Sequence, residues 1–259
     1  TRPIALKTEQ KPVLYVPLIK QPIHLDGRLD EPAWREAAVL ERWAPCPGVA
    51  SLAPAAQLRL FTDGDTLYAA FTLPIADAAS AGLRKPAKSQ DEYGGSLFEF
   101  FIDPRSEGKE KFQFCANPLG LRHDSRNDDA KWNGAWRSAG AVGDRAWTVE
   151  IAVPLSDLAC APVSFNSGRQ FCANFGFIAS DGSSYSWTGR WGAPESDYGI
   201  LYFGTEQDYA PRLRSVVKLS CLLDRECYDP RDVTAVALLQ VLSRAAEVPC
   251  GVLDAEETP

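Results

Sequence analysis

The chain has 259 residues, of which 45% are hydrophobic and 24% are charged, and its formal net charge is −7. This length allows one large or two small domains with a sizeable core. The acidic balance, with no basic run to offset it, argues against nucleic acid or an anionic membrane as a partner. No apolar stretch is long enough to span a membrane, so no transmembrane segment is expected.

The first predicted elements lie between residues 13 and 34. Residues 13–19 alternate as an edge strand that Pro17 interrupts, because proline cannot donate to a sheet. The string IHLDGRLDEPAW follows at 23–34, with a turn at Asp26-Gly27 and a short helix around Pro32. We expect Trp34 to fill the core rather than to bind a ligand.

A hairpin and a long loop come next. Residues 57–61 and 66–73 alternate between apolar and polar side chains, and Asp63-Gly64-Asp65 joins them as a turn. Residues 74–93 are polar and show no periodicity, which is typical of loops that carry function.

Residues 97–121 predict a second, aromatic-rich hairpin near the middle of a sheet. Phe98 and Phe100 share one face by period-two alternation, and Glu99 points to the other face. The first strand ends at Asp103-Pro104, and Asn117 and the proline after it end the second strand. A carboxylate at position 99 must meet water, a cation or a polar ligand.

The remaining segments continue the β pattern. Residues 122–133 predict an exposed loop, and the polar stretch 180–197 predicts another. Residues 147–155, 171–179 and 198–203 predict strands. Many short strands with almost no helix predict an all-β fold, an antiparallel β-sandwich.

The end of the chain differs from the rest. We expect a domain boundary that separates the sandwich, residues 1–209, from a C-terminal extension, residues 210–259, of unknown role. Residues 229–248 have apolar side chains spaced for one face of a helix, so this extension is predicted to be partly helical.

The same segments resemble family 9 carbohydrate-binding modules between about residues 23 and 203. The string at 23–34 is similar to the opening of these modules, and EFFIDP at 99–104 is similar to their strand E-x-F-I-D-P. Weaker matches follow at the 57–73 hairpin, at Trp147 to Pro154 and in the final strand. In the strand at 171–179 a phenylalanine replaces the family's tryptophan and its arginine is absent, so any role of that arginine is in doubt here.

This resemblance implies non-catalytic recognition of a polysaccharide or oligosaccharide outside the cytoplasm, whether periplasmic, cell-surface or secreted. A sugar needs flat aromatic faces and a few polar groups that bind its hydroxyls. The candidate carbohydrate-binding residues are Trp187, Tyr93, Trp191, Glu99, Asn117 and Arg122. Tyr93 stands where the resemblance suggests a stacking tryptophan. The alternative is a purely structural role, in which the rings pack on their own loops and the polar groups form surface ion pairs.

A calcium ion is a second expectation, and it would be structural. Oxygen-bearing side chains gather at Asp124, Asn127, Asp128 and Asp129, but they lack EF-hand spacing, so a solvated loop is the favoured interpretation. The seven cysteines contain no C-x-x-C pair, so zinc is not expected.

Catalysis is not expected. An enzyme hypothesis would pair Glu99 with Glu150 as acid and base, as in glycosidases, but no flanking motif supports it. Related sandwiches hold haem between Met and His, and the absence of Met disfavours that class. The alternative functions are an accessory scaffold or protein-interaction domain without a sugar site, or a glycoside hydrolase-associated domain with weak catalytic potential.

Overall fold

The computed structural model describes residues 11–83, 95–163, 169–191 and 197–206. Residues Lys11–Thr205 form one compact unit. The predicted helix at 229–248 lies outside the described residues. Tyr93 also lies outside them.

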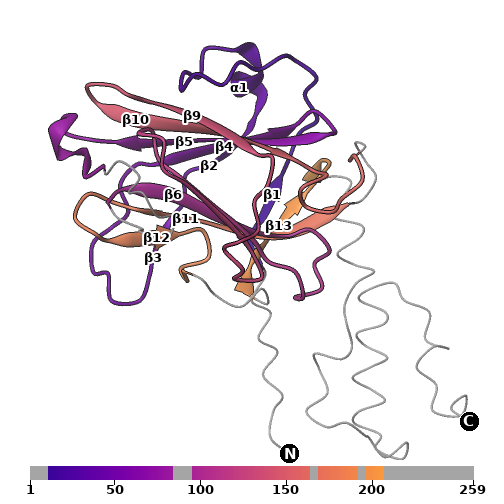
Figure 1. The fold of residues 1–259 in the computed structure, drawn as a ribbon. Coiled ribbons are helices and arrows are strands. Elements are labelled where there is room, and N and C mark those ends of the chain that lie inside the picture. Colours follow the sequence, from indigo (N-terminus) through magenta and orange to yellow (C-terminus); the bar gives the residue numbers. More distant parts are fainter. Residues whose placement is uncertain (1–10, 84–94, 164–168, 192–196, 207–259) are drawn as a thin grey trace, which may run out of the picture. The chain divides into compact units, whose positions relative to one another are not determined.

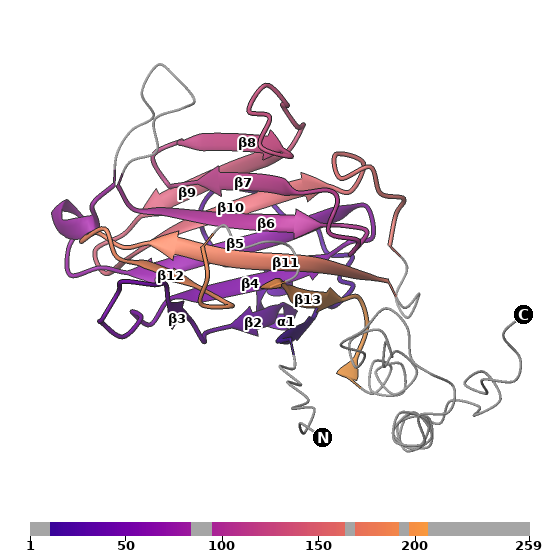
Figure 2. The same cartoon turned by 90° about the horizontal axis from the view of Figure 1, so that it is seen from below.

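The compact unit is built from two β-sheets (Figures 1 and 2). The first has the order β1 (Val13–Tyr15), β13 (Gly199–Tyr202), β11 (Gln170–Ile178), β6 (Leu97–Asp103), β7 (Phe112–Ala116) and β8 (Arg122–Arg126). In addition, β12 (Ser184–Ser186) pairs with β11, and β3 (Ala44–Pro45) pairs with β12. We call it the eight-stranded sheet. The all-β sandwich is therefore confirmed.

The second sheet has five strands in the order β2 (Ala38–Leu40), β4 (Gln57–Thr62), β5 (Thr66–Pro74), β10 (Ala146–Pro154) and β9 (Arg137–Val142). The only helices in the described residues are α1 (Pro32–Glu36) and the 3-10 turn η1 (Ala79–Ala81). Neighbouring strands pair antiparallel except for β1 and β13, which run parallel. Both predicted hairpins form, as β4–β5 and β6–β7.

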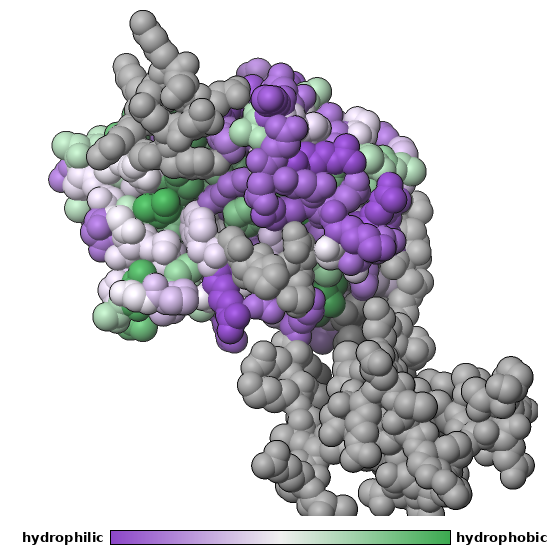
Figure 3. All heavy atoms as spheres, turned by 60° about the horizontal axis from the view of Figure 1, so that its bottom comes forward, coloured by the Kyte–Doolittle hydropathy of each residue, from purple (hydrophilic) through white to green (hydrophobic). Residues whose placement is uncertain are grey.

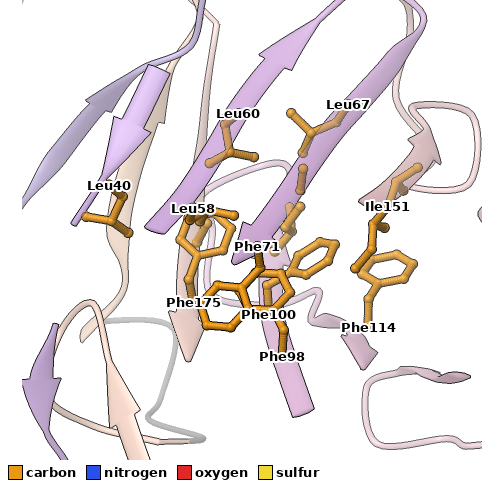
Figure 4. Close-up of a cluster of buried hydrophobic side chains, with 14 of the residues drawn as sticks. Leu40, Leu58, Leu60, Leu67, Phe71, Phe98, Phe100, Phe114, Ile151 and Phe175 are labelled. Atoms are coloured by element: carbon orange, nitrogen blue, oxygen red, sulfur yellow. The ribbon is translucent and has the colours of Figure 1, made fainter. Parts of the chain in front are cut away.

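The core lies between the sheets, where alternate side chains of facing strands meet (Figure 4). Phe98 and Phe100 of β6 point inward as the period-two pattern predicts, and Phe71 of β5 stacks on Phe98 with ring centroids 4.6 Å apart. The cysteines of the described residues, Cys46, Cys115, Cys160 and Cys172, are buried, and none of them forms a disulfide. For Cys115 and Cys172 this agrees with their apolar strand context.

The outer face of the five-stranded sheet is covered by the segment that leads into α1. Trp34 is 1% exposed and packs edge-on against Phe61, so its predicted core position is confirmed. The Glu150 carboxylate of β10 accepts hydrogen bonds from the N–H of Asp26, the N–H of Gly27 and Nε1 of Trp34, at 2.9, 2.6 and 3.0 Å. This contact links two distant segments of the chain. The segment before and within α1 supplies the donors, and β10 supplies their acceptor.

Two predicted loops contain strands. Within the predicted loop 180–197, Ser184–Ser186 form strand β12, in which Tyr185 and Ser186 are buried. Residues 122–133 were expected to form an exposed loop, but Arg122–Arg126 form strand β8, in which His123, Asp124 and Ser125 are buried. The polar composition hid this strand because β8 borders the sheet and takes its register from β7 rather than from an apolar pattern of its own.

Candidate functional site

A cross-strand row of polar residues crosses the outer face of the eight-stranded sheet. Consecutive strand pairings place Ser186 of β12 beside Gly176 of β11, Gly176 beside Glu99 of β6, Glu99 beside Cys115 of β7, and Cys115 beside His123 of β8. All five residues of this row are buried. The sequence could not show this row, because the register joins strands that are far apart in the chain.

Glu99 is the central charged group of this row. Nε2 of Gln113 donates a short hydrogen bond to Oε1 of Glu99, and Oε1 of Gln113 accepts one from Oγ of Ser125 at 2.8 Å. Burial raises the pKa of Glu99 to about 7, while hydrogen bonds from Gln113 and Cys115 and the charge of Lys111 oppose the rise. Glu99 therefore gains or loses a proton near neutral pH.

Trp191 lies over the gap that Gly176 leaves in the row. A β-carbon at position 176 would lie 2.6 Å from Cζ3 and 2.9 Å from Cε3 of Trp191, so only glycine permits this approach. Trp191 is half-buried and therefore keeps part of its surface open to solvent. An aromatic ring thus sits between the positions of Ser186 and Glu99.

Asn174 holds the segment that carries Trp191. Its Nδ2 donates to the carbonyl of Arg190 at 2.7 Å, and its Oδ1 accepts from the N–H of Thr188 at 3.3 Å. Within the described residues, Oγ of Ser186 and Oγ1 of Thr188 are buried and have no hydrogen-bond partner. The face therefore contains polar groups that a ligand or water would satisfy. In Figure 3, which turns this side forward, hydrophilic residues gather over one part of the surface.

Trp187 lies elsewhere. Its backbone N–H donates to the carbonyl of Phe175 at 2.8 Å. Its ring contacts the ring of Phe175 and lies against Gly199 at the edge of the core. Successive strand residues face opposite sides of a sheet. Trp187 contacts Phe175 on the core side, and Trp191 lies against Gly176 on the outer side, so the two tryptophans are on opposite sides. The structure does not bring the two tryptophans together on one face of the sheet.

Asn117 and Arg122 also have local structural partners. Oδ1 of Asn117 accepts the N–H groups of Leu119 and Leu121, which closes the turn after β7. The Arg122 guanidinium lies 4.3 Å from the ring centroid of Trp136 and donates to the carbonyl of that residue. Arg122 pairs with Ala116, which faces the core, so its side chain starts on the side away from Glu99.

The proposed calcium ligands are spread over separate contacts. Oδ2 of Asp124 accepts from the N–H of Gly134, Asp128 pairs with Lys111, and Oδ1 of Asn127 accepts the backbone N–H of Lys111. Oδ1 of Asp129 accepts the N–H of Lys131. Across the described ranges, no group of three or more His, Cys, Asp or Glu side chains is arranged to hold a metal ion.

The acid–base pair of the enzyme hypothesis does not form. Glu99 lies on the outer face of the eight-stranded sheet, and Glu150 lies on the outer face of the five-stranded sheet under α1. Both sheets and the core between them separate the two carboxylates. Burial raises the pKa of Glu150 to about 7, although the N–H groups of Gly27, Asp26 and Trp34 oppose the rise. Its role is to anchor the segment before α1.

Comparison with solved structures agrees with this architecture. A family 9 carbohydrate-binding module from Caldicellulosiruptor kristjanssonii, in complex with cellotriose, matches with a TM-score of 0.54 at 16% identity, over 76% of this chain and 96% of that one. The described part has a family 9 module fold. The same kind of module in complex with glucose matches with a TM-score of 0.54 at 16% identity, over 74% of this chain and 95% of that one. A Bacteroides uniformis protein with a proposed carbohydrate-binding role matches at 0.53 and 15% identity, over 74% of this chain and 99% of that one.

No protein-family model matches the chain, and no curated protein is similar to it in sequence. Among the described residues, no helix is both long and apolar enough to cross a membrane.

The sequence singled out Glu99 and Trp191 as candidates, but not the residues that the structure places around them, Gly176, Gln113 and Asn174. One signal was present: a glycine inside the strand string CANFGF indicates a close approach of another group. No sequence signal identified Gln113, because a polar residue that alternates with phenylalanines also fits a solvent-facing position.

Proposed function

We propose that the chain binds a polysaccharide or oligosaccharide without catalysis, on the outer face of the eight-stranded sheet. The observation that carries the proposal is Trp191 seated over Gly176 directly beside Glu99. The open part of the indole offers a surface for the C–H face of a pyranose. Glu99, Gln113 and the hydroxyls of Ser186 and Thr188 are groups that can exchange hydrogen bonds with sugar hydroxyls.

The fold supports this proposal, because solved modules with the same architecture were crystallised with cellotriose and glucose. The separation of Glu99 from Glu150 supports a binding role over a hydrolytic one. A role outside the cytoplasm, and an association with a glycoside hydrolase, belong to the same proposal.

One observation favours the competing function, an accessory scaffold without a sugar site. Glu99 is only 3% exposed, so a sugar must reach it through a small movement of Trp191 or of its neighbours. A scaffold would leave this carboxyl permanently covered.

A glycan array on the purified chain, followed by calorimetry on the strongest ligand, separates the two functions. We expect Trp191→Ala to weaken binding by about tenfold or more, on the scale of about 1–3 kcal/mol per stacked ring. Trp132→Ala is the matched control, because Trp132 is also half-buried but packs on Phe112 and Phe114 on the core side. Absence of any glycan ligand, or equal losses in both variants, would favour the scaffold.

A further inference from the structure

A groove of about 490 Å³ opens at the edge of the sandwich, away from the row that contains Glu99. It runs along β1, which borders the eight-stranded sheet, and β2, which borders the five-stranded sheet. Its walls include Val13, Leu14, Val39, Glu41, Arg42 and Trp187. This volume lies within the range of small-molecule sites, and apolar and polar groups line the groove in similar measure.

Trp187 gives the groove its aromatic wall. The backbone of Trp187 is fixed by its hydrogen bond to Phe175, and its ring is supported by Phe175 and by Gly199, where a β-carbon would lie 2.5 Å from Cζ3. The side chain is half-buried and lines the groove with its remaining surface. A supported and partly open indole is a ready-made stacking surface.

The remaining walls add an apolar face and a polar rim. Val39 is 41% exposed, which makes it one of the few large hydrophobic residues open to solvent in the described residues. Glu41 and Arg42 are exposed at the rim, and Oε1 of Glu41 accepts Nε2 of Gln57 at 2.7 Å. Arg42 makes no ion pair with any described residue, and its guanidinium carries a fork of donors that suits vicinal hydroxyls.

An extended peptide is a poorer occupant, although two edge strands border the groove. Strands β1 and β2 are each 3 residues long, and Pro12 comes directly before β1. Short edge strands and nearby prolines are the features by which proteins prevent an added strand from pairing. The walls therefore favour a compact ligand that has both an apolar face and hydroxyls.

We propose that this groove is a second carbohydrate-contact site, in which a pyranose ring packs on Trp187 and Val39 while Arg42 and Glu41 bind its hydroxyls. The class of ligand rests on the proposed function, but no residue is shared with the site at Trp191. A chain with two such sites would contact two points of one glycan, or two glycans.

Methyl-resolved NMR of the full chain tests this site directly. Cellotriose, xylotriose, mannotriose and maltotriose are added one at a time at about 10 mM, above a millimolar Kd. We expect at least one sugar to shift the methyl signals of Val13, Leu14 and Val39 in a saturable way. The shifts should persist in the Trp191→Ala chain, because the outer-face site is separate.

Val39→Glu places a charge in the groove and should weaken the saturable shifts at Leu14 by about tenfold or more. Val142→Glu is the matched control: Val142 is 37% exposed on β9, at the opposite border of the same sheet, and should leave the titration unchanged.

The outcomes separate this site from the outer-face site. If no sugar shifts the groove methyls, or if Val142→Glu acts as strongly as Val39→Glu, the second site is refuted even when Trp191-dependent binding is found. If the groove methyls respond and Trp191→Ala changes no affinity, the second site stands and the outer-face proposal fails. Shifts produced by an unstructured peptide but by none of the sugars would also refute the groove as a carbohydrate site.

Discussion

Replacing Glu99 with glutamine should change how the stability of the fold depends on pH. Burial raises the folded-state pKa of Glu99 from 4.5 to about 7. Since the folded pKa lies above the unfolded one, the folded state prefers the neutral acid. The contribution of Glu99 to stability is therefore full below pH 4.5, falls as the unfolded chain alone ionises, and levels off above pH 7. At about 1.4 kcal/mol per pKa unit the total loss is about 3 kcal/mol.

The assay is urea unfolding of the wild type and the variant at a series of pH values from about 4.5 to 8. Glutamine keeps the shape of the side chain and cannot ionise. The free energy of unfolding of the variant should therefore rise relative to that of the wild type as the pH increases. Glu107→Gln is the control, because Glu107 is an exposed loop residue. Parallel pH profiles for wild type and Glu99→Gln would refute the raised pKa and the burial argument behind it.

Several further outcomes are expected. Trp34→Ala should lower the free energy of unfolding by about 3–5 kcal/mol in urea titrations, because a buried indole leaves a cavity; a loss below about 1 kcal/mol would contradict its core position. Glu150→Gln should cost about 1–3 kcal/mol in the same assay, since one amide oxygen cannot accept every N–H donor that the carboxylate serves. Gly176→Ala should displace Trp191 and weaken glycan binding in calorimetry while the fold persists by circular dichroism; unchanged affinity would exclude Trp191 from the site. If the calcium expectation holds, calcium should raise the melting temperature, and Asp124→Asn should abolish the rise; equal melting curves with calcium and with chelator would end it.

Much of the sandwich could be predicted from local pattern. The hairpins at 57–73 and 97–121 carry their own turns and period-two alternation, and Trp34 lies in a string whose turn and helix signals are local. The face on which Glu99 lies also follows from alternation alone. These features need no knowledge of distant partners.

The arrangement of the site could not be predicted in this way. Whether Trp187 or Trp191 lies beside Glu99 depends on how β12 pairs with β11, which no short stretch of sequence encodes. Asn117 and Arg122 looked like ligand-reading groups because carboxamide and guanidinium chemistry suits sugars. The same chemistry suits a backbone turn and a tryptophan ring, and the structure uses it there.

The hydrogen bonds to Glu150 set an order for folding during synthesis. They join residues that are 116 to 124 positions apart, so the segment of Asp26 to Trp34 leaves the ribosome long before its anchor exists. At about 5–20 residues per second, roughly 6–25 s pass before β10 is made. During that interval the indole N–H of Trp34 lacks its acceptor, and nothing anchors the segment that packs on Phe61. Pausing or slowed translation between these segments would therefore lengthen the exposure of an aromatic surface, and a chaperone that recognises such surfaces would act at this stage.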